Sequence, residues 1–275
     1  MSGAEWFSNT EHINPYYGDG GVDVAQAARE HKTIAEAFRE AGIKVVKVPA
    51  PERCQDGVYT ANWGLAIEGK AIMSRLPSAR KAEELYARGK LAELGYEVIE
   101  VPEGLKFSGQ GDCLPCGKYL LAGSGYRSDE DAQKFAAEIM GLKLVQLRAI
   151  PEIDERDQPV INAASGWADS FFYDIDLALA VVREDLIAYC PEAFVPESRE
   201  KIEELPMEKI VVSYKEATEG FACNLVSTGK TVVMSGDAPE LRAELECRGI
   251  KVITPKVEEL KKGGGYIRCV SLALG

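Results

Sequence analysis

Short apolar segments rich in β-branched residues recur along the chain and alternate with longer stretches whose apolar positions follow a helical period. The short segments are predicted strands, at residues 42–48, 95–101, 141–147, 209–213 and 249–253. The longer stretches predict helices before four of these strands, at residues 22–41, 80–94, 129–140 and 238–248. Candidate N-caps are Asp129 and Asp237, and a glycine follows each helix, at Gly42, Gly95, Gly141 and Gly249.

Pairs of apolar runs joined by a polar turn predict a hairpin after each strand except the last. The hairpins are expected at residues 65–73, 113–121, 177–189 and 225–234. The apolar run 270–274 is predicted as a buried strand that completes a fifth hairpin, for which the N-terminal residues are a candidate partner. Unequal spacing makes this a quasi-repeat, so the chain is expected to be an α/β ring of five units.

Composition narrows the function classes. A chain of 275 residues with 46% hydrophobic and 28% charged content is typical of an ordinary globular protein. A net charge of −12 argues against binding nucleic acid or anionic membranes and favours a small cationic ligand. Seven scattered cysteines do not form a disulfide framework, and no segment has the pattern of a signal peptide or a membrane span. We therefore expect a cytoplasmic protein.

Polar residues stand just before the predicted hairpins and would meet at the axis of a ring. These residues are Asn62, Asp112, Asp176, Asn224 and, at the fifth place, Cys269. One interpretation is a binding site built from converging polar side chains. The alternative is that Asn and Asp simply begin turns and that Cys269 is a small buried hydrophobe. The preceding glycines, 263–265, and the adjacent arginine favour a nucleophile at Cys269.

Seven segments carry a resemblance to a known superfamily. They are Asn14-Pro15 and residues 55–62, 75–83, 107–112, 125–129, 172–176 and 263–269. In this order and spacing the chain resembles the guanidine-modifying penteins: arginine deiminase, arginine dihydrolase, dimethylarginine dimethylaminohydrolase and the amidinotransferases. Its motifs are most similar to the arginine dihydrolase type. The resemblance implies a five-bladed α/β propeller with pseudo-fivefold repeats, formed as a single domain by residues 1–275.

The resemblance also implies roles for individual residues. Cys269 would attack the guanidinium carbon, giving a covalent amidino-thioether that water or an amine resolves. Carboxylates bind a planar cation through charge-assisted hydrogen bonds, and the residues implied in this clamp are Asp56, Asp112 and Asp176, assisted by Asn62. Candidates for binding a substrate carboxylate are Arg75 and Arg127. No metal or organic cofactor is implied.

Two catalytic positions depart from the family pattern. Ser108 stands where the family has glutamate, and Asp174 stands where it has the histidine that serves as general acid and base. An aspartate could donate a proton there only if burial or neighbouring carboxylates raised its pKa, and Asp176 is close enough in sequence to share one. The two histidines are His31, predicted on a helix surface, and His12, a candidate substitute base.

Three functions therefore stay open. The first is a guanidino-compound C–N hydrolase of the arginine deiminase or dihydrolase type, or an amidinotransferase, with an altered acid and base. The second is a catalytically inactive pentein that binds a cationic amino-acid ligand. The third is an enzyme in which Asp174 contacts a cationic group of a different substrate. Each predicts a small cationic guanidino or amino-acid partner, and each is compatible with a homo-oligomer.

Overall fold

The computed structural model describes residues 1–18 and 20–275 and shows a mixed α/β fold. Its strands form four three-stranded sheets of one design, in which an antiparallel hairpin is extended by a third strand parallel to the second. The strands are β1 (Gly64–Ile67), β2 (Lys70–Met73), β3 (Glu97–Glu100), β4 (Cys113–Cys116), β5 (Tyr119–Gly123), β6 (Lys143–Leu147), β7 (Leu179–Arg183), β8 (Leu186–Tyr189), β9 (Glu208–Val211), β10 (Val226–Ser227), β11 (Thr231–Val233) and β12 (Lys251–Ile253). The four predicted hairpins and four of the predicted strands are thus confirmed.

Helices precede the third strand of each sheet. The helices are α1 (Val24–Glu40), α2 (Lys81–Glu93), α3 (Glu130–Met140), α4 (Pro196–Glu204), α5 (Tyr214–Thr218) and α6 (Pro239–Cys247). The four predicted glycines follow helix ends with positive φ, at Gly42, Gly95, Gly141 and Gly249, a conformation that other residues adopt at a cost. The sequence patterns predicted α1, α2, α3 and α6 but missed α4 and α5.

One of the two predicted N-caps is wrong. Asp129 is the N-cap residue of α3, but the N-cap residue of α6 is Ala238 rather than Asp237. The free backbone N–H groups at the start of α6 donate instead to the carboxylate of Glu216, from Glu240 at 2.6 Å and Leu241 at 3.0 Å. A side chain distant in sequence therefore satisfies the donors that a local cap would otherwise satisfy.

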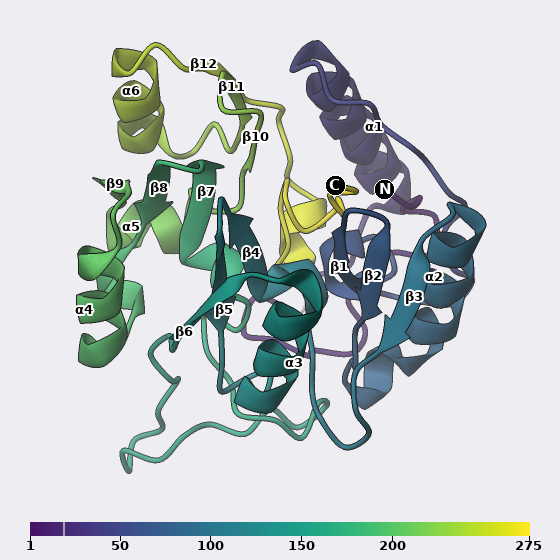
Figure 1. Ribbon diagram of the computed structural model, residues 1–275. Coiled ribbons are helices and arrows are strands. Elements are labelled where there is room, and N and C mark those ends of the chain that lie inside the picture. The colour runs from purple at the N-terminus through teal and green to yellow at the C-terminus, as the bar shows by residue number, and fades with distance from the viewer. Residues whose placement is uncertain (19) are drawn as a thin grey trace.

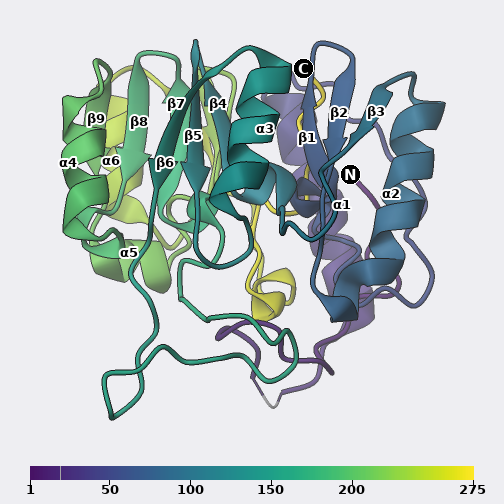
Figure 2. The ribbon, with the colours of Figure 1, turned by 60° about the horizontal axis from the view of Figure 1, so that its bottom comes forward.

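The sheets lie around the centre of the molecule, where the C-terminal segment passes between them (Figure 1). The first strands of neighbouring sheets lie side by side, since β7 is next to both β4 and β10. Figure 2 shows the hairpin turns at one end and, at the opposite end, the N-terminal segment beside the long connection between β6 and β7. None of the helices in the described ranges is long and apolar enough to cross a membrane.

The fifth predicted unit has no regular strands. Residues 42–48 pair with the chain start, where the Met1 amino group donates to the Val46 carbonyl and the Val48 N–H donates to the Met1 carbonyl, both at 3.0 Å. The run 270–274 is not a strand, and Leu274 is 37% exposed. The side chain of Gln110 bonds both the N–H and the carbonyl of Ala273 at 2.9 Å. The prediction of a buried C-terminal strand was therefore wrong, because a glutamine side chain replaces the strand partner.

Candidate active site

Cys269 is buried in the C-terminal segment, and Tyr266, Ile267 and Arg268 separate it from the glycine-rich segment 263–265. Gly264 has φ 79°, and a Cβ atom there would collide with Asn14 and Tyr173. A Cβ atom on Gly265 would collide with Tyr59 and with Cys269 itself. Glycine is required here because other side chains pack directly against the backbone that leads to the cysteine.

The side-chain amide of Asn224 hydrogen-bonds both the backbone and the thiol of this segment. Its carbonyl oxygen accepts hydrogen bonds from the backbone N–H groups of Tyr266 (3.2 Å), Arg268 (3.0 Å) and Cys269 (3.2 Å). Its NH₂ group lies 3.1 Å from the Cys269 sulfur and donates to it. One side chain thus sets both the backbone and the thiol of Cys269. Asn224 itself comes just before the fourth hairpin, as the predicted ring of polar residues requires.

Carboxylates surround the cysteine. Asp176 is fully buried, with its two oxygens 3.6 and 3.9 Å from the Cys269 sulfur and one oxygen 3.7 Å from Nε of Arg268. Asp112 accepts a hydrogen bond at Oδ1 from the Ile175 N–H at 3.1 Å. Its buried Oδ2 has no hydrogen-bond partner among the described residues. The cluster therefore combines a carboxylate in contact with the thiol, Asp176, and an unpartnered acceptor atom on Asp112, whose charge interacts with that of Asp176.

Burial dominates the electrostatics of the cluster. It raises the pKa of Asp176 to about 8, and the neighbouring Asp174 adds to this, while Arg268 opposes it. Burial and the charge of Asp174 likewise raise the pKa of Asp112 well above its ordinary value. Burial, with Asp176 and Asp174, raises the pKa of the Cys269 thiol. Around neutral pH the carboxyl groups of the cluster thus retain protons that they would lose in water, and the Cys269 thiol is protonated.

The two positions that depart from the family pattern touch each other. The Ser108 hydroxyl donates to Oδ1 of Asp174 at 2.7 Å. The Asn62 amide donates to Oδ2 of Asp174 at 2.7 Å and to the Ser108 oxygen at 2.9 Å. Both Asp174 oxygens therefore have partners, in a buried unit that joins the starts of three different hairpins.

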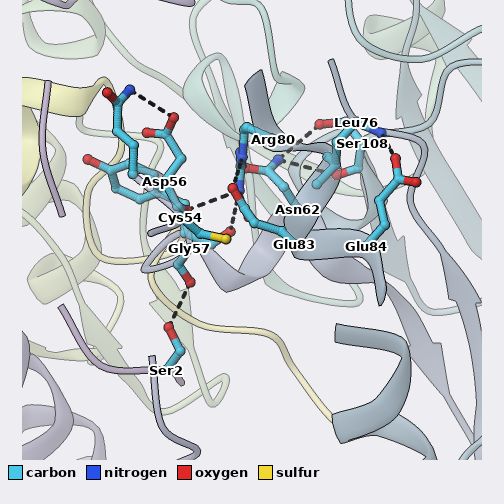
Figure 3. A network of polar contacts seen from close by, with 12 residues as sticks. Ser2, Cys54, Asp56, Gly57, Asn62, Leu76, Arg80, Glu83, Glu84 and Ser108 are labelled. Carbon is cyan, nitrogen blue, oxygen red and sulfur yellow. Dashed lines mark hydrogen bonds and ion pairs between the residues drawn. The ribbon is translucent and has the colours of Figure 1, made fainter. Parts of the chain in front are cut away.

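A buried ion pair supports this unit from the side (Figure 3). The Arg80 guanidinium contacts both Glu83 oxygens, at 2.8 and 2.7 Å, and donates to the Asn62 carbonyl oxygen at 2.8 Å. It also donates to the backbone carbonyl of Asp56 at 3.1 Å. A bidentate pair of this kind fixes geometry as well as charge. Arg80 thereby orients the amide of Asn62 toward Asp174.

Comparison with known proteins identifies the family. A family model described as N,N dimethylarginine dimethylhydrolase, eukaryotic, matches residues 18–274. The N(G),N(G)-dimethylarginine dimethylaminohydrolase of Mycobacterium tuberculosis is 31% identical over all of this chain and 84% of its own length. The chain belongs to the dimethylarginine dimethylaminohydrolase family. This membership confirms the predicted guanidine-modifying superfamily and the prediction of an enzyme of the guanidino C–N hydrolase type.

Other members of the same group are similar along nearly the whole chain. The bifunctional arginine dihydrolase/ornithine cyclodeaminase ArgZ of Synechocystis is 30% identical over 94% of this chain, which spans only 35% of ArgZ. A crystal structure of the N-terminal domain of ArgZ matches the whole chain with a TM-score of 0.89 at 27% identity and is itself 96% covered. The dimethylarginine dimethylaminohydrolase family and this arginine dihydrolase thus share the fold described above.

Within this family framework, the structure brings most of the predicted site residues together. Cys269, Asp112, Asp176, Asn62, Ser108 and Asp174 all belong to the buried cluster or to the unit beside it. Asp56 is buried as well, but its carboxylate already accepts hydrogen bonds from the hydroxyl of Tyr17 and, at 3.2 Å, from Gln55. Burial raises the pKa of Asp56 to about 6, and Arg80 partly offsets this.

The two predicted arginines differ in their positions. Arg75 lies at 3.2 Å from Glu100 and donates to the Val101 carbonyl, and no described contact joins it to the cysteine cluster. Arg80 lies in the same predicted segment, 75–83, and is the arginine of that segment that is buried. Its i,i+3 spacing to Glu83 is the feature of the sequence that indicates an ion pair there. Arg127 is buried, stacks 4.0 Å from the Tyr173 ring centroid and donates to the Ile13 carbonyl.

Both histidine predictions need correction. His12 is exposed, and its ring stacks on Tyr17 at 5.7 Å, away from the carboxylates around Cys269. His31 is buried in α1 rather than on its surface, and Nε2 has no hydrogen-bond partner in the described chain. Burial, together with the positive charges of Lys47 and the N-terminus, lowers the pKa of His31 to about 3. The helix predicted from periodicity is confirmed, but His31 lies on its buried face rather than on the exposed face that its polar side chain suggested.

Proposed function

We propose that this protein hydrolyses the guanidinium C–N bond of an arginine-related small molecule through a covalent intermediate on Cys269. The observation that carries the proposal is the buried cluster in which the Cys269 sulfur lies 3.6 Å from Asp176. The wider framework we propose is a single domain of residues 1–275, a five-bladed α/β propeller in which the chain start, residues 42–48 and the C-terminal segment make the fifth blade.

A planar cation suits this cluster. The unpartnered Oδ2 of Asp112 and the oxygens of Asp176 are acceptors, and a guanidinium presents N–H donors in one plane. A bound cation would also stabilise the thiolate of Cys269, whose pKa burial raises, and the thiol proton can pass to the Asp176 carboxylate 3.6 Å away. Ligand binding would thus generate the thiolate that burial disfavours, while the proton stays in the carboxylate cluster.

The chemistry then follows from the position of the sulfur. The thiolate adds to the guanidinium carbon, a proton goes to the departing nitrogen, and the C–N bond breaks to leave an amidino-thioether. Water adds to the same carbon, the C–S bond breaks, and the sulfur electron pair returns to Cys269. A solved structure of the ArgZ N-terminal domain is described as covalently bound to a reaction intermediate, which supports this route. An amine in place of water would make the reaction an amidino transfer.

The proton donor must differ from the family's histidine. Both Asp174 oxygens accept hydrogen bonds, from Ser108 and Asn62, so Asp174 serves as a fixed acceptor. Asp112 and Asp176 hold protons near neutral pH because burial, together with the charge of Asp174, disfavours their ionised forms. We propose that these two carboxyl groups hold the proton that the leaving nitrogen takes, in place of the proton shared by Asp174 and Asp176 that the sequence suggested.

Relatives indicate the substrate class. Dimethylarginine is the substrate in the name of the M. tuberculosis relative, and a complex of a cysteine variant of AgrE with L-arginine is known. Arg127, buried beside Tyr173, is the arginine we assign to a substrate carboxylate. Arg75 is not assigned to the substrate carboxylate, because its guanidinium already contacts Glu100 and the Val101 carbonyl.

A second candidate is a binding protein that does not turn its ligand over. The raised pKa of the Cys269 thiol and the aspartate at position 174 favour this alternative. The deciding experiment incubates the purified protein with L-arginine, Nω,Nω-dimethyl-L-arginine and agmatine, and measures ammonia, urea and amine release. Release that disappears in Cys269→Ser supports the hydrolase. No release, together with a ligand-induced rise in Tm, supports the binding protein.

A further inference from the structure

Tyr16 is an aromatic residue beside Tyr173 that the mechanism above does not use. Its ring packs against Phe171 at 4.8 Å, Phe221 at 4.9 Å and Tyr173 at 6.2 Å between centroids. Phe171 belongs to the long connection between β6 and β7, which lies beside the N-terminal segment in Figure 2. Tyr16 therefore joins the two segments that cover this end of the molecule.

The Tyr16 hydroxyl points inward and lacks a partner. The side chain is half-buried, yet its oxygen is inaccessible to solvent and has no hydrogen-bond partner in residues 1–18 and 20–275. Burial raises the pKa of Tyr16, and Cys269 and Asp176 are among the groups whose charges raise it further. A buried hydroxyl without a partner is unfavourable, and native proteins rarely keep one without a reason. A ligand at Cys269 would supply the missing partner.

The backbone that carries Tyr16 is tied to the nucleophile segment. The Tyr16 N–H donates to Oδ1 of Asn14 at 2.9 Å, and the Asn14 amide donates to the Gly263 carbonyl at 3.0 Å. The Tyr173 hydroxyl, beneath the Tyr16 ring, donates to the Gly264 carbonyl at 2.8 Å. These bonds connect Tyr16 to the glycine-rich segment that leads to Cys269.

We propose that Tyr16 is a substrate-contacting residue: its ring closes the site over Cys269, and its hydroxyl hydrogen-bonds the planar cationic end of the ligand. This inference rests on the proposed function for the nature of the ligand. Two acceptors without partners, the Tyr16 oxygen and Oδ2 of Asp112, then receive N–H groups of one guanidinium. The hydroxyl thereby contributes to selection of a cation that carries free N–H groups.

The first test separates the hydroxyl from the ring. In a Cys269→Ala background, which blocks turnover, Tyr16→Phe is compared with the parent by thermal shift and by titration with L-arginine and Nω,Nω-dimethyl-L-arginine. Removing the unpartnered hydroxyl is expected to raise the Tm of the free protein by about 2 °C. It is expected to weaken L-arginine binding about tenfold. A tyrosine with only a structural role would not give a higher Tm together with weaker L-arginine binding when its hydroxyl is removed.

Tyr189→Phe is the matched control. Tyr189 is buried, but its hydroxyl has a partner in Glu203. Its loss is expected to lower the Tm and to leave L-arginine binding unchanged. Unchanged L-arginine affinity in Tyr16→Phe, with the parent binding normally, would overturn the proposed contact and leave the proposed function intact.

The second test needs no ligand. Wild-type protein, Tyr16→Ala and the distant control Tyr86→Ala are treated with iodoacetamide, and alkylation of Cys269 is followed by peptide mass mapping. Loss of the covering ring is expected to accelerate Cys269 alkylation at least about tenfold in Tyr16→Ala only, because the thiol is otherwise inaccessible. An equal rate in all three proteins would overturn the closing role. If neither amino acid binds the parent, the proposed substrate class fails, and this alkylation result alone decides for or against Tyr16.

Discussion

Replacing Asp176 by asparagine should change how the stability of the protein depends on pH. Asp176 is completely buried, and its pKa is raised from 3.8 to about 8. Between these two pH values the folded protein keeps a proton that the unfolded chain has lost. The contribution of Asp176 to stability is therefore greatest below about pH 4 and falls as the pH rises toward 8. Asparagine resembles the protonated acid in shape and cannot ionise, so this loss disappears in the variant.

The expected size follows from the linkage relation. One proton bound only by the folded state lowers the free energy of unfolding by about 1.4 kcal/mol for each pH unit. Between about pH 5 and pH 7 the wild type should therefore lose about 3 kcal/mol relative to Asp176→Asn. Urea denaturation at intervals across this range measures the difference, provided that the slope against urea concentration stays constant.

Asp131→Asn is the surface control, since the Asp131 side chain is 73% exposed, and its difference from wild type should stay nearly constant with pH. A constant difference for Asp176→Asn as well would refute the reasoning. It would mean that Asp176 is ionised throughout, and that its contact with Arg268 at 3.7 Å outweighs burial. Asp176 would then hold no proton for the leaving nitrogen, and Asp112 alone would have to supply it.

Three further outcomes are expected. Asn224→Ala leaves three backbone N–H groups of the Cys269 segment without their acceptor. Urea denaturation should therefore show a free energy of unfolding lower by about 3 kcal/mol or more, and an unchanged free energy of unfolding would contradict the anchoring role. The double substitution Ser108→Glu with Asp174→His restores the family pair, and steady-state assays should show kcat raised roughly a hundredfold; an unchanged kcat would mean that this position takes no part in proton transfer. His31→Leu removes a group whose pKa falls from 6.5 to about 3 on folding, so acid titration followed by circular dichroism should show less loss of stability below about pH 6 than in wild type.

Local patterns predicted the repeating part of the fold. Hairpins, third strands, most helices and the glycines with positive φ have sequence patterns that extend over only a few residues. The four units that contain regular sheets could therefore be identified from the sequence. The pairing within the fifth unit could not be predicted, because it is made by the Met1 backbone and by the Gln110 side chain. Helix α4 was missed because its nine residues are mostly charged, and α5 because it is only five residues long.

The candidate site was predictable in its members but not in its contacts. Polar residues before successive hairpins predicted a cluster around Cys269, and the described contacts bring Asp176 and Asn224 to its sulfur, at 3.6 and 3.1 Å. The hydrogen bond between Ser108 and Asp174 joins residues 66 positions apart, and no spacing in the sequence indicates it. Arg75 was selected instead of Arg80 because burial, which distinguishes the two, depends on tertiary packing.

The central claim is that Cys269 forms a covalent bond with the guanidinium carbon. Rapid acid quenching of the wild-type protein with L-arginine or Nω,Nω-dimethyl-L-arginine, followed by intact mass measurement and peptide mapping, tests it most directly. The account predicts an amidino adduct on the peptide that contains Cys269, and neither adduct nor product in Cys269→Ser. Product formation that persists in Cys269→Ser would contradict it.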